Sequence, residues 1–136
     1  MSLKNCIPVA RDIVINNQVV TTHLGDNPET KVTFARAIQG MEKPYITINV
    51  GAADYDSTVR RENASAAYRI DYITYAESGS EALTIHNSMF SVMRQATDDD
   101  FDIRILDEDY FVDVDGVHRA TISVVFRTNI TTQANA

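Results

Sequence analysis

The last third of the chain contains the feature that most restricts the fold. Two stretches rich in β-branched and aromatic residues, Tyr110–Val114 and Val117–Thr128, are separated only by Asp115-Gly116. An Asp-Gly pair between such stretches is a strong signal for a β-hairpin, because a type I′ turn needs positive φ at both central positions. The second stretch alternates, so we expect one strand face to carry these residues: His118, Ala120, Ile122, Val124 and Phe126. The chain therefore has to build an antiparallel sheet.

Further strands are expected before this hairpin. Lys31–Ile38, Tyr45–Val50 and Ala67–Ala76 have the composition of strands, and Tyr45–Val50 alternates with a period of two. Asp102–Leu106 predicts a short strand of its own. Together with the hairpin, these stretches predict a sheet of about five strands.

A helix is clearly marked between the two groups of strands. Ser78 and Glu81 have the spacing of a capping box. Apolar residues then recur at steps of three and four: Ala82, Ile85, Met89, Val92 and Ala96. Such a stripe has to be buried against a sheet. The acids that follow, Asp98–Asp100, end the helix because negative charge at a helix C-terminus opposes the macrodipole.

Residues 7–24 predict a first helix, although their β-branched residues would also suit a strand. Gly25 is a suitable C-cap for this helix. The expected fold is therefore α+β, with a mainly antiparallel sheet of about five strands and helices packed on one face, in the order α-β-β-β-α-β-β. The length suits one domain over residues 1–128, and the polar residues 129–136 are expected to form a flexible tail.

Charge and composition argue against several classes of function. The net charge is −7, and residues 98–115 hold nine acids against one arginine, so this stretch carries −8 and the remainder +1. Specific nucleic-acid binding is not expected, because Arg60-Arg61 is the only adjacent basic pair. No apolar run reaches the ~20 residues of a membrane span. The first residues lack a signal-peptide core, and the single Cys6 cannot form an internal disulfide, so we expect an intracellular protein.

The sequence gives only weak signals for a metal or catalytic site. His23, His86 and His118 fall on different expected elements, which favours packed or rim histidines over metal ligands. Asp98, Asp100 and Asp102 have the odd-position spacing of a calcium loop, but the glycine and the bidentate glutamate of such a loop are missing. A solvated acidic edge is the preferred interpretation. No nucleophile elbow, phosphate-binding loop or dinucleotide fingerprint is present, so we expect no enzyme activity, cofactor or metal.

The connection Gly51–Ala66 is longer than a hairpin loop requires. It could be a surface loop, or two strands that extend into a long hairpin. It could equally be an arm that contacts a neighbouring subunit, since mixed charges fix the register of such a contact. The residues that would form this interface are Tyr55, Val59, Arg60, Arg61 and Glu62.

With these elements in place, the chain resembles the phage tail-terminator and tail-completion proteins, the group that includes the minor tail protein U of phage lambda and other small neck proteins. The resemblance is carried by Pro44–Ile48, Tyr68–Tyr72, the helix Glu81–Gln95 and the ending Asp115–Ala120. It implies a structural virion protein that forms a homo-oligomeric ring, commonly a hexamer. This ring would join head and tail through tail-tube and head-completion partners, after assembly in the cytoplasm of the bacterial host.

Such a ring has to let DNA pass without binding it, and acidic walls repel phosphate. We therefore expect part of the acidic stretch to line or rim the channel: Asp98, Asp99, Asp100, Asp102, Asp107, Glu108 and Asp109. Two alternatives stay open. The chain could be another virion part, such as a head-closure or tail-tube subunit, or it could be a small ligand-binding α+β domain with a site made from dispersed residues.

Overall fold

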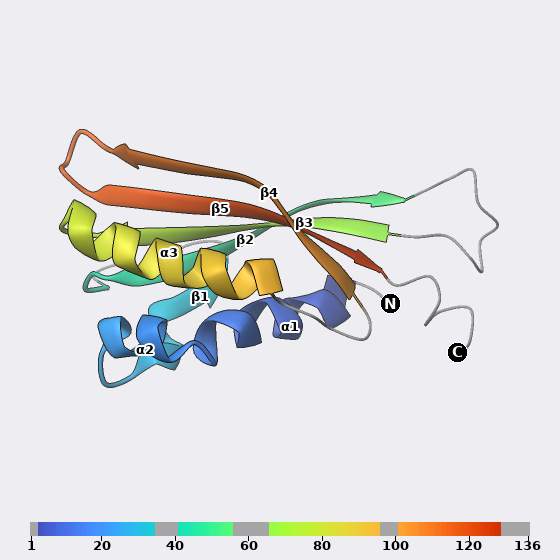
Figure 1. Cartoon of the computed structure of the whole chain (residues 1–136), viewed down its shortest axis with the longest axis horizontal. Coiled ribbons are helices and arrows are strands. Elements are labelled where there is room, and N and C mark those ends of the chain that lie inside the picture. The colour runs from blue at the N-terminus through green and yellow to red at the C-terminus, as the bar shows by residue number, and fades with distance from the viewer. Residues whose placement is uncertain (1–2, 35–40, 56–65, 96–100, 129–136) are drawn as a thin grey trace.

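The computed structural model describes residues 3–34, 41–55, 66–95 and 101–128. Their elements follow in this order (Figure 1): α1 (Leu3–Ile15), α2 (Gln18–Leu24), a 3-10 turn η1 (Pro28–Lys31), β1 (Val32–Phe34), β2 (Tyr45–Tyr55), β3 (Ala66–Ala76), α3 (Gly79–Gln95), β4 (Phe101–Val112) and β5 (His118–Thr128). The strands form one five-stranded sheet in the order β1-β2-β3-β5-β4. Among the described strands only the β1–β2 pair is parallel, so the predicted α+β class and mainly antiparallel sheet are confirmed.

The single helix predicted over residues 7–24 is wrong in its extent, because α1 and α2 are separate helices that meet at Asn17. The Asn17 side-chain oxygen accepts hydrogen bonds from the N–H groups of Val19 and Val20 at 3.1 and 3.3 Å, which caps α2. The Asn17 side-chain nitrogen donates to the carbonyl oxygen of Ser88 on α3 at 3.2 Å. One buried asparagine therefore starts α2 and ties the helix junction to α3.

The first strands differ from the prediction in length. The strand predicted over Lys31–Ile38 begins one residue later, since Lys31 closes the 3-10 turn, and its described part is Val32–Phe34. β2 continues five residues beyond the predicted end at Val50. A register shift after Val50 accompanies this continuation, and β3 stays paired with β2 as far as Ala66. The two strands therefore extend into a long hairpin, which was one of the readings left open for this connection.

The two short strands predicted at Asp102–Leu106 and Tyr110–Val114 are one strand, β4, with a bulge between Ile105 and Asp107. The bulge lets the acidic residues between the two stretches stay paired with β5. The predicted two-residue turn is also wrong. The last strand pair joins Val112 to the first residue of β5, so the turn spans the five residues 113–117.

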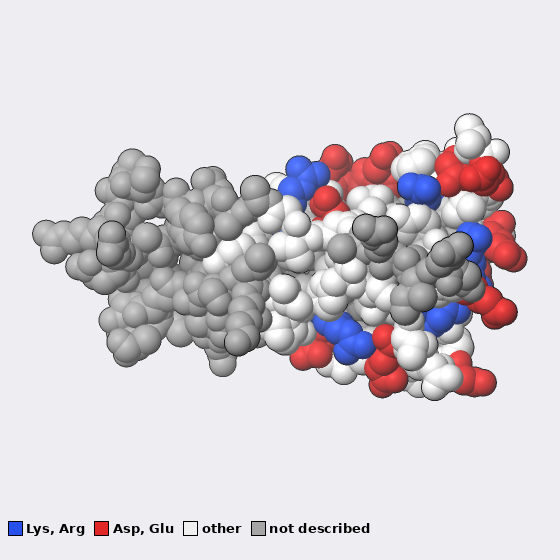
Figure 2. Space-filling view, turned by 180° about the vertical axis from the view of Figure 1, so that it is seen from behind, with Lys and Arg blue, Asp and Glu red and all other residues white. Residues whose placement is uncertain are grey.

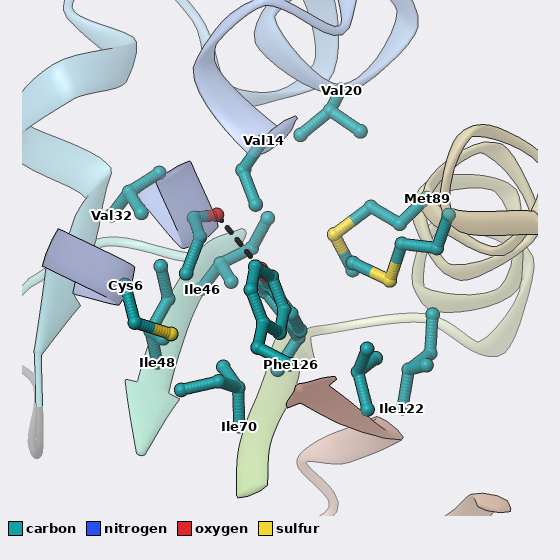
Figure 3. Close-up of a cluster of buried hydrophobic side chains, with 14 of the residues drawn as sticks. Cys6, Val14, Val20, Val32, Ile46, Ile48, Ile70, Met89, Ile122 and Phe126 are labelled. Atoms are coloured by element: carbon teal, nitrogen blue, oxygen red, sulfur yellow. Dashed lines mark hydrogen bonds between the residues drawn. The ribbon is translucent and has the colours of Figure 1, made fainter. Parts of the chain in front are cut away.

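One buried cluster joins all three helices to the sheet (Figure 3). Val14 of α1, Val20 of α2 and Met89 of α3 meet strand residues that include Ile46, Ile48, Ile70, Ile122 and Phe126. The predicted core face of β5 is confirmed for Ala120, Ile122, Val124 and Phe126, which are all fully buried, whereas His118 at the start of the strand is only half-buried. The predicted stripe of α3 needs one correction. Met93 is buried where Val92 was expected, because the helical periodicity carries the stripe four residues on from Met89.

A tyrosine inside this cluster links the sheet to α1. The Tyr72 hydroxyl on β3 donates a hydrogen bond of 2.8 Å to the carbonyl oxygen of Ala10. Burial, and after it the neighbouring Cys6, raise the pKa of Tyr72 well above its ordinary value, so the hydroxyl donates as a neutral group. Cys6 itself is fully buried.

Candidate assembly surface

β4 is an edge strand of the described sheet, because it pairs with β5 on one side only. The bulge at Leu106 changes which of its residues face the core. Before the bulge, Ile103 and Ile105 pack against the buried cluster. After it, Glu108 and Tyr110 take the core side, opposite Ile122 and Ala120 of β5. The outer face, which is the side of the sheet away from the buried cluster, then receives Asp107, Asp109 and Phe111.

The bulge separates the acidic residues that were predicted to line a channel. Three of them are exposed on the outer face of β4: Asp102, Asp107 and Asp109. Glu108 lies on the opposite side of the strand, toward α3. The Arg104 Nε atom lies 2.9 Å from an oxygen of Asp102 and offsets that charge. Asp98–Asp100 lie outside the described residues. Seen from behind, acidic side chains lie along both long edges of the described part of the molecule and at the end where the β4–β5 turn lies (Figure 2).

Glu108 contacts a buried histidine. His86 on α3 is 4% exposed, and its Nε2 atom lies 2.8 Å from the Glu108 Oε1 atom. The Phe90 ring stacks beside it, with the ring centres 6.5 Å apart. Within the part of the chain that the structure describes, the other ring nitrogen, Nδ1, has no hydrogen-bond partner. His86 is thus a packed residue that fastens α3 to the edge strand, as the sequence favoured.

The turn between β4 and β5 is held in shape by Asp113. Its Oδ1 atom accepts hydrogen bonds from the N–H groups of Asp115 and Val117 at 3.0 and 3.1 Å, and its Oδ2 atom lies 3.1 Å from Arg119. Gly116, with φ at +80°, donates its N–H to the Asp113 carbonyl. Desolvation acts to raise the pKa of Asp113, but the two backbone N–H groups and Arg119 outweigh it and lower that pKa.

A row of aromatic rings and one cation crosses the outer face beside this turn. The Tyr45 and Tyr75 rings stack with centres 4.8 Å apart. The Arg119 guanidinium lies 4.9 Å from the centre of the Tyr75 ring and 5.6 Å from that of Phe111. Burial, and then the charge of Tyr75, raise the pKa of Tyr45. These residues come from β2, β3, β5 and β4 in register, so the row ties the turn to the middle of the sheet.

Three apolar residues stay exposed at this end of the hairpin, and we call them the tip patch: Phe111 (43% exposed) on the outer face of β4, Val112 (49%) on its other face and Val114 (102%) in the turn. The Asp113 and Arg119 contacts fix the conformation of the turn that carries Val114. Exposed apolar side chains can mark contact surfaces, and all three lie at the same end of the β4–β5 hairpin. The tip patch and the acidic outer face of β4 together form the candidate assembly surface.

The interface predicted in the connection after β2 is described only at its start. Tyr55 is the last residue of β2 and is paired in register with Ala66 of β3. Val59, Arg60, Arg61 and Glu62 lie outside the described residues, so their role as an interface stays a prediction.

No group of three or more His, Cys, Asp and Glu side chains that could hold a metal ion occurs within residues 3–34, 41–55, 66–95 and 101–128. A depression of about 270 Å³ lies on the outer face beside the bulge, lined by Asp102, Arg104, Leu106, Val125 and Arg127. None of the described helices combines the length and the apolar character that crossing a membrane requires.

The fold has a counterpart in a virion. The chain matches no protein-family model and no curated protein sequence. Among solved structures, it is similar to a chain from the virion of a native gene transfer agent particle, with a TM-score of 0.67 and 12% identity over 87% of this chain and 90% of that chain. The bacteriophage SPP1 gp17 protein also aligns, over 95% of this chain and 97% of that chain with 18% identity, but at a TM-score of 0.42. The first similarity establishes a shared fold.

Proposed function

We propose that this chain is a structural virion protein without enzyme activity, which forms a ring at the neck or tail end of a phage-like particle. The observation that carries the proposal is the fold shared with a virion chain over nearly the full length of both. The ring would contact a tail-tube protein on one side and head-completion proteins on the other. This role matches the tail-completion group that the sequence resembles.

The distribution of charge supports a ring that DNA can traverse. Asp107 and Asp109 stand exposed on the outer face of β4, and the whole chain carries −7. Six copies would carry −42 in total. A channel wall with this sign repels phosphate, so the DNA passes without being held. We propose that the outer face of β4 faces or rims that channel.

The first test measures the mass of the purified protein in solution. A closed ring of defined copy number is the expected result. Filaments of unlimited length would instead identify a tail-tube subunit, which polymerises without closing. A monomer at every concentration would contradict the ring, and would favour the alternative of a small ligand-binding domain. Electron microscopy of the same sample shows whether the assembly has a central hole.

The second test concerns the channel. Replacing Asp102, Asp107 and Asp109 by lysine reverses the charge of the outer face of β4. We expect particles that assemble normally and release DNA more slowly than wild type. The matched control replaces Asp12, Asp26 and Glu29 by lysine, because these three exposed acids lie outside the sheet and give the same change of charge. Unchanged DNA release and unchanged infectivity in the triple variant would remove the channel assignment.

A further inference from the structure

The outer face of the sheet has two halves of opposite charge along the β4–β5 hairpin. Among the described residues of β3, β4, β5 and the turn, the half at the turn holds five acids and one arginine: Asp71, Asp107, Asp109, Asp113, Asp115 and Arg119. The half at the other end of the hairpin holds three arginines and one acid: Arg69, Arg104, Arg127 and Asp102. Five acids against one arginine give −4, and three arginines against one acid give +2, so the two halves attract each other when they belong to different copies.

The depression beside the bulge lies in the positive half, and we call it the bulge depression. Its volume is about 270 Å³, and it is lined by Asp102, Arg104, Leu106, Val125 and Arg127. Leu106 is 57% exposed and supplies apolar surface together with Val125. Asp102 is paired with Arg104, whereas Arg127 is exposed and forms no ion pair with any described residue. The bulge depression therefore offers aliphatic surface beside a guanidinium that can still take a carboxylate partner.

The β4–β5 turn carries the complementary groups. Val114 is fully exposed. Asp113 is paired with Arg119, whereas Asp115 is exposed and forms no ion pair within the part of the chain that the structure describes. The hydrogen bonds from the Asp115 and Val117 N–H groups to Asp113 hold the turn in one conformation before copies meet, which lowers the entropy cost of association. The turn thus presents an aliphatic side chain beside a carboxylate.

These two surfaces cannot meet within one copy. Asp102 and Val112 lie near opposite ends of β4, which corresponds to roughly 30 Å along a strand paired with β5 throughout. A contact between the turn and the bulge depression therefore needs a second copy. A contact between two turns would bring like charges together, which costs binding free energy. A contact between two different surfaces instead repeats in one direction, and it closes into a ring if the rotation allows it.

We propose that the β4–β5 turn of one copy docks in the bulge depression of the neighbouring copy, with Val114 against Leu106 and Asp115 beside Arg127. This inference rests on the ring of the proposed function and names the contact that joins its copies. It gives the exposed Leu106 an apolar partner and gives Asp115 and Arg127 the ion pair that they do not form within one copy. Asp107 and Asp109 lie between the two surfaces along β4, so they stay available to the channel.

Disulfide cross-linking between two separately purified variants tests the contact. Val114→Cys and Leu106→Cys are mixed under oxidising conditions, and a covalent dimer of one copy of each is expected. Both substituted residues are exposed, so the fold should tolerate the changes. Wild type is the first control, since its Cys6 is buried. Val114→Cys mixed with Leu83→Cys is the second, because Leu83 is exposed on α3 outside the proposed contact.

Charge reversal gives an independent readout. Arg127→Asp and Asp115→Arg each place like charges at the contact, and we expect each to raise the dissociation constant between copies by about tenfold. The double variant with both changes restores the attraction and should recover most of this loss. Mass measurement over a concentration series compares the variants. Arg94→Asp and Asp26→Arg are the matched controls, because they change exposed charges outside both surfaces and should have little effect.

The outcomes separate the contact from the ring. Rings that form in both charge variants, without a mixed disulfide dimer, would overturn the contact and leave the ring intact. Disulfide dimers formed by Val114→Cys alone would show a contact between two turns and contradict the inference. Protection of Leu106→Cys from a thiol reagent in dilute monomer would also contradict it, because residues of the same copy would then cover the depression. A wild-type chain that is monomeric at every concentration would remove the ring and the contact together. A mixed disulfide dimer from an assembly that stops at two copies would keep the contact and remove the ring.

Discussion

The two halves of β4 share one partner strand but have different surroundings. Before the bulge at Leu106, Phe101 is 2% exposed and belongs to the buried cluster. After the bulge, Phe111 is 43% exposed and lies on the outer face. Both phenylalanines lie opposite residues of β5 in the same ladder. Strand pairing alone therefore does not decide burial. The bulge puts Phe111 on the outer face, and the residues after it on the core side, Glu108, Tyr110 and Val112, are exposed as well.

The two halves of β4 therefore have different roles. The half before the bulge, residues 101–105, contributes to folding because its apolar residues Phe101, Ile103 and Ile105 reach the core. The half after the bulge, residues 107–112, is called the outer half here. It buries little apolar surface and leaves acidic residues and the tip patch exposed for contacts with other copies. An edge strand that combines charges with a bulge also resists unwanted pairing with other edges. The following predictions test this division, starting with the largest expected effect.

Removing a phenylalanine from each half should give very different losses of stability. We expect Phe101→Ala to lower the free energy of unfolding by about 3–5 kcal/mol, because it leaves a cavity beside Phe126. Phe111→Ala removes only an exposed ring above Arg119 and should cost about 1 kcal/mol or less. Urea denaturation of both variants measures the difference. Equal losses would show that the two halves are not distinct.

Adjacent acids in the outer half should also differ. Glu108→Ala removes the partner that lies 2.8 Å from the buried His86, and we expect the free energy of unfolding to fall by about 1–2 kcal/mol. Asp107→Ala is the control, since this residue is exposed on the other side of the strand and its change should stay within about 0.5 kcal/mol. Thermal unfolding at neutral pH compares the two variants. A larger loss for Asp107 would contradict the assignment of faces after the bulge.

The start of α3 should be sensitive to the outer half of β4. A Cβ atom on Gly79 would lie 2.8 Å from the Tyr110 hydroxyl, which is hydrogen-bonded to His118. Gly79→Ala should therefore cost about 1 kcal/mol, although alanine normally favours a helix. Tyr110→Phe in the same background removes the crowded oxygen and should recover most of the loss. Denaturation curves for the single and double variants decide this, and a stabilising Gly79→Ala would exclude the close contact.

The smallest effect concerns the turn. Because the pKa of Asp113 is lower in the folded protein than its ordinary value of 3.8, its ionised form stabilises the fold at neutral pH. This contribution is complete above pH 3.8 and is lost as the pH falls through the lower, folded value. Asp113→Asn should therefore unfold at a lower temperature than wild type at neutral pH, and the difference should vanish in acid. A difference that persists unchanged at low pH would assign the effect to hydrogen bonding alone.

Much of the fold could be predicted from local patterns. The period-two alternation of β5 placed its buried residues correctly, since each side chain in a strand points opposite to the next. Ser78 was correctly placed at the start of α3, where its hydroxyl oxygen accepts a hydrogen bond from the Glu81 N–H at 3.2 Å. Gly25 likewise ends α2, with φ at +95°. These features depend on residues a few positions apart, which the sequence displays directly.

Tertiary structure alone decided the rest. Asn17 caps α2 locally, but the hydrogen bond from its side chain to Ser88, 71 residues away, fixes the helix junction against α3. The bulge at Leu106 places Glu108 beside His86 of α3 and its neighbours Asp107 and Asp109 on the outer face, although all three looked like one acidic surface. Local spacing determines the type of an element, since backbone geometry sets the side-chain period. The side on which a charge lies depends on which strand and helix pack against it, and those partners come from distant parts of the chain.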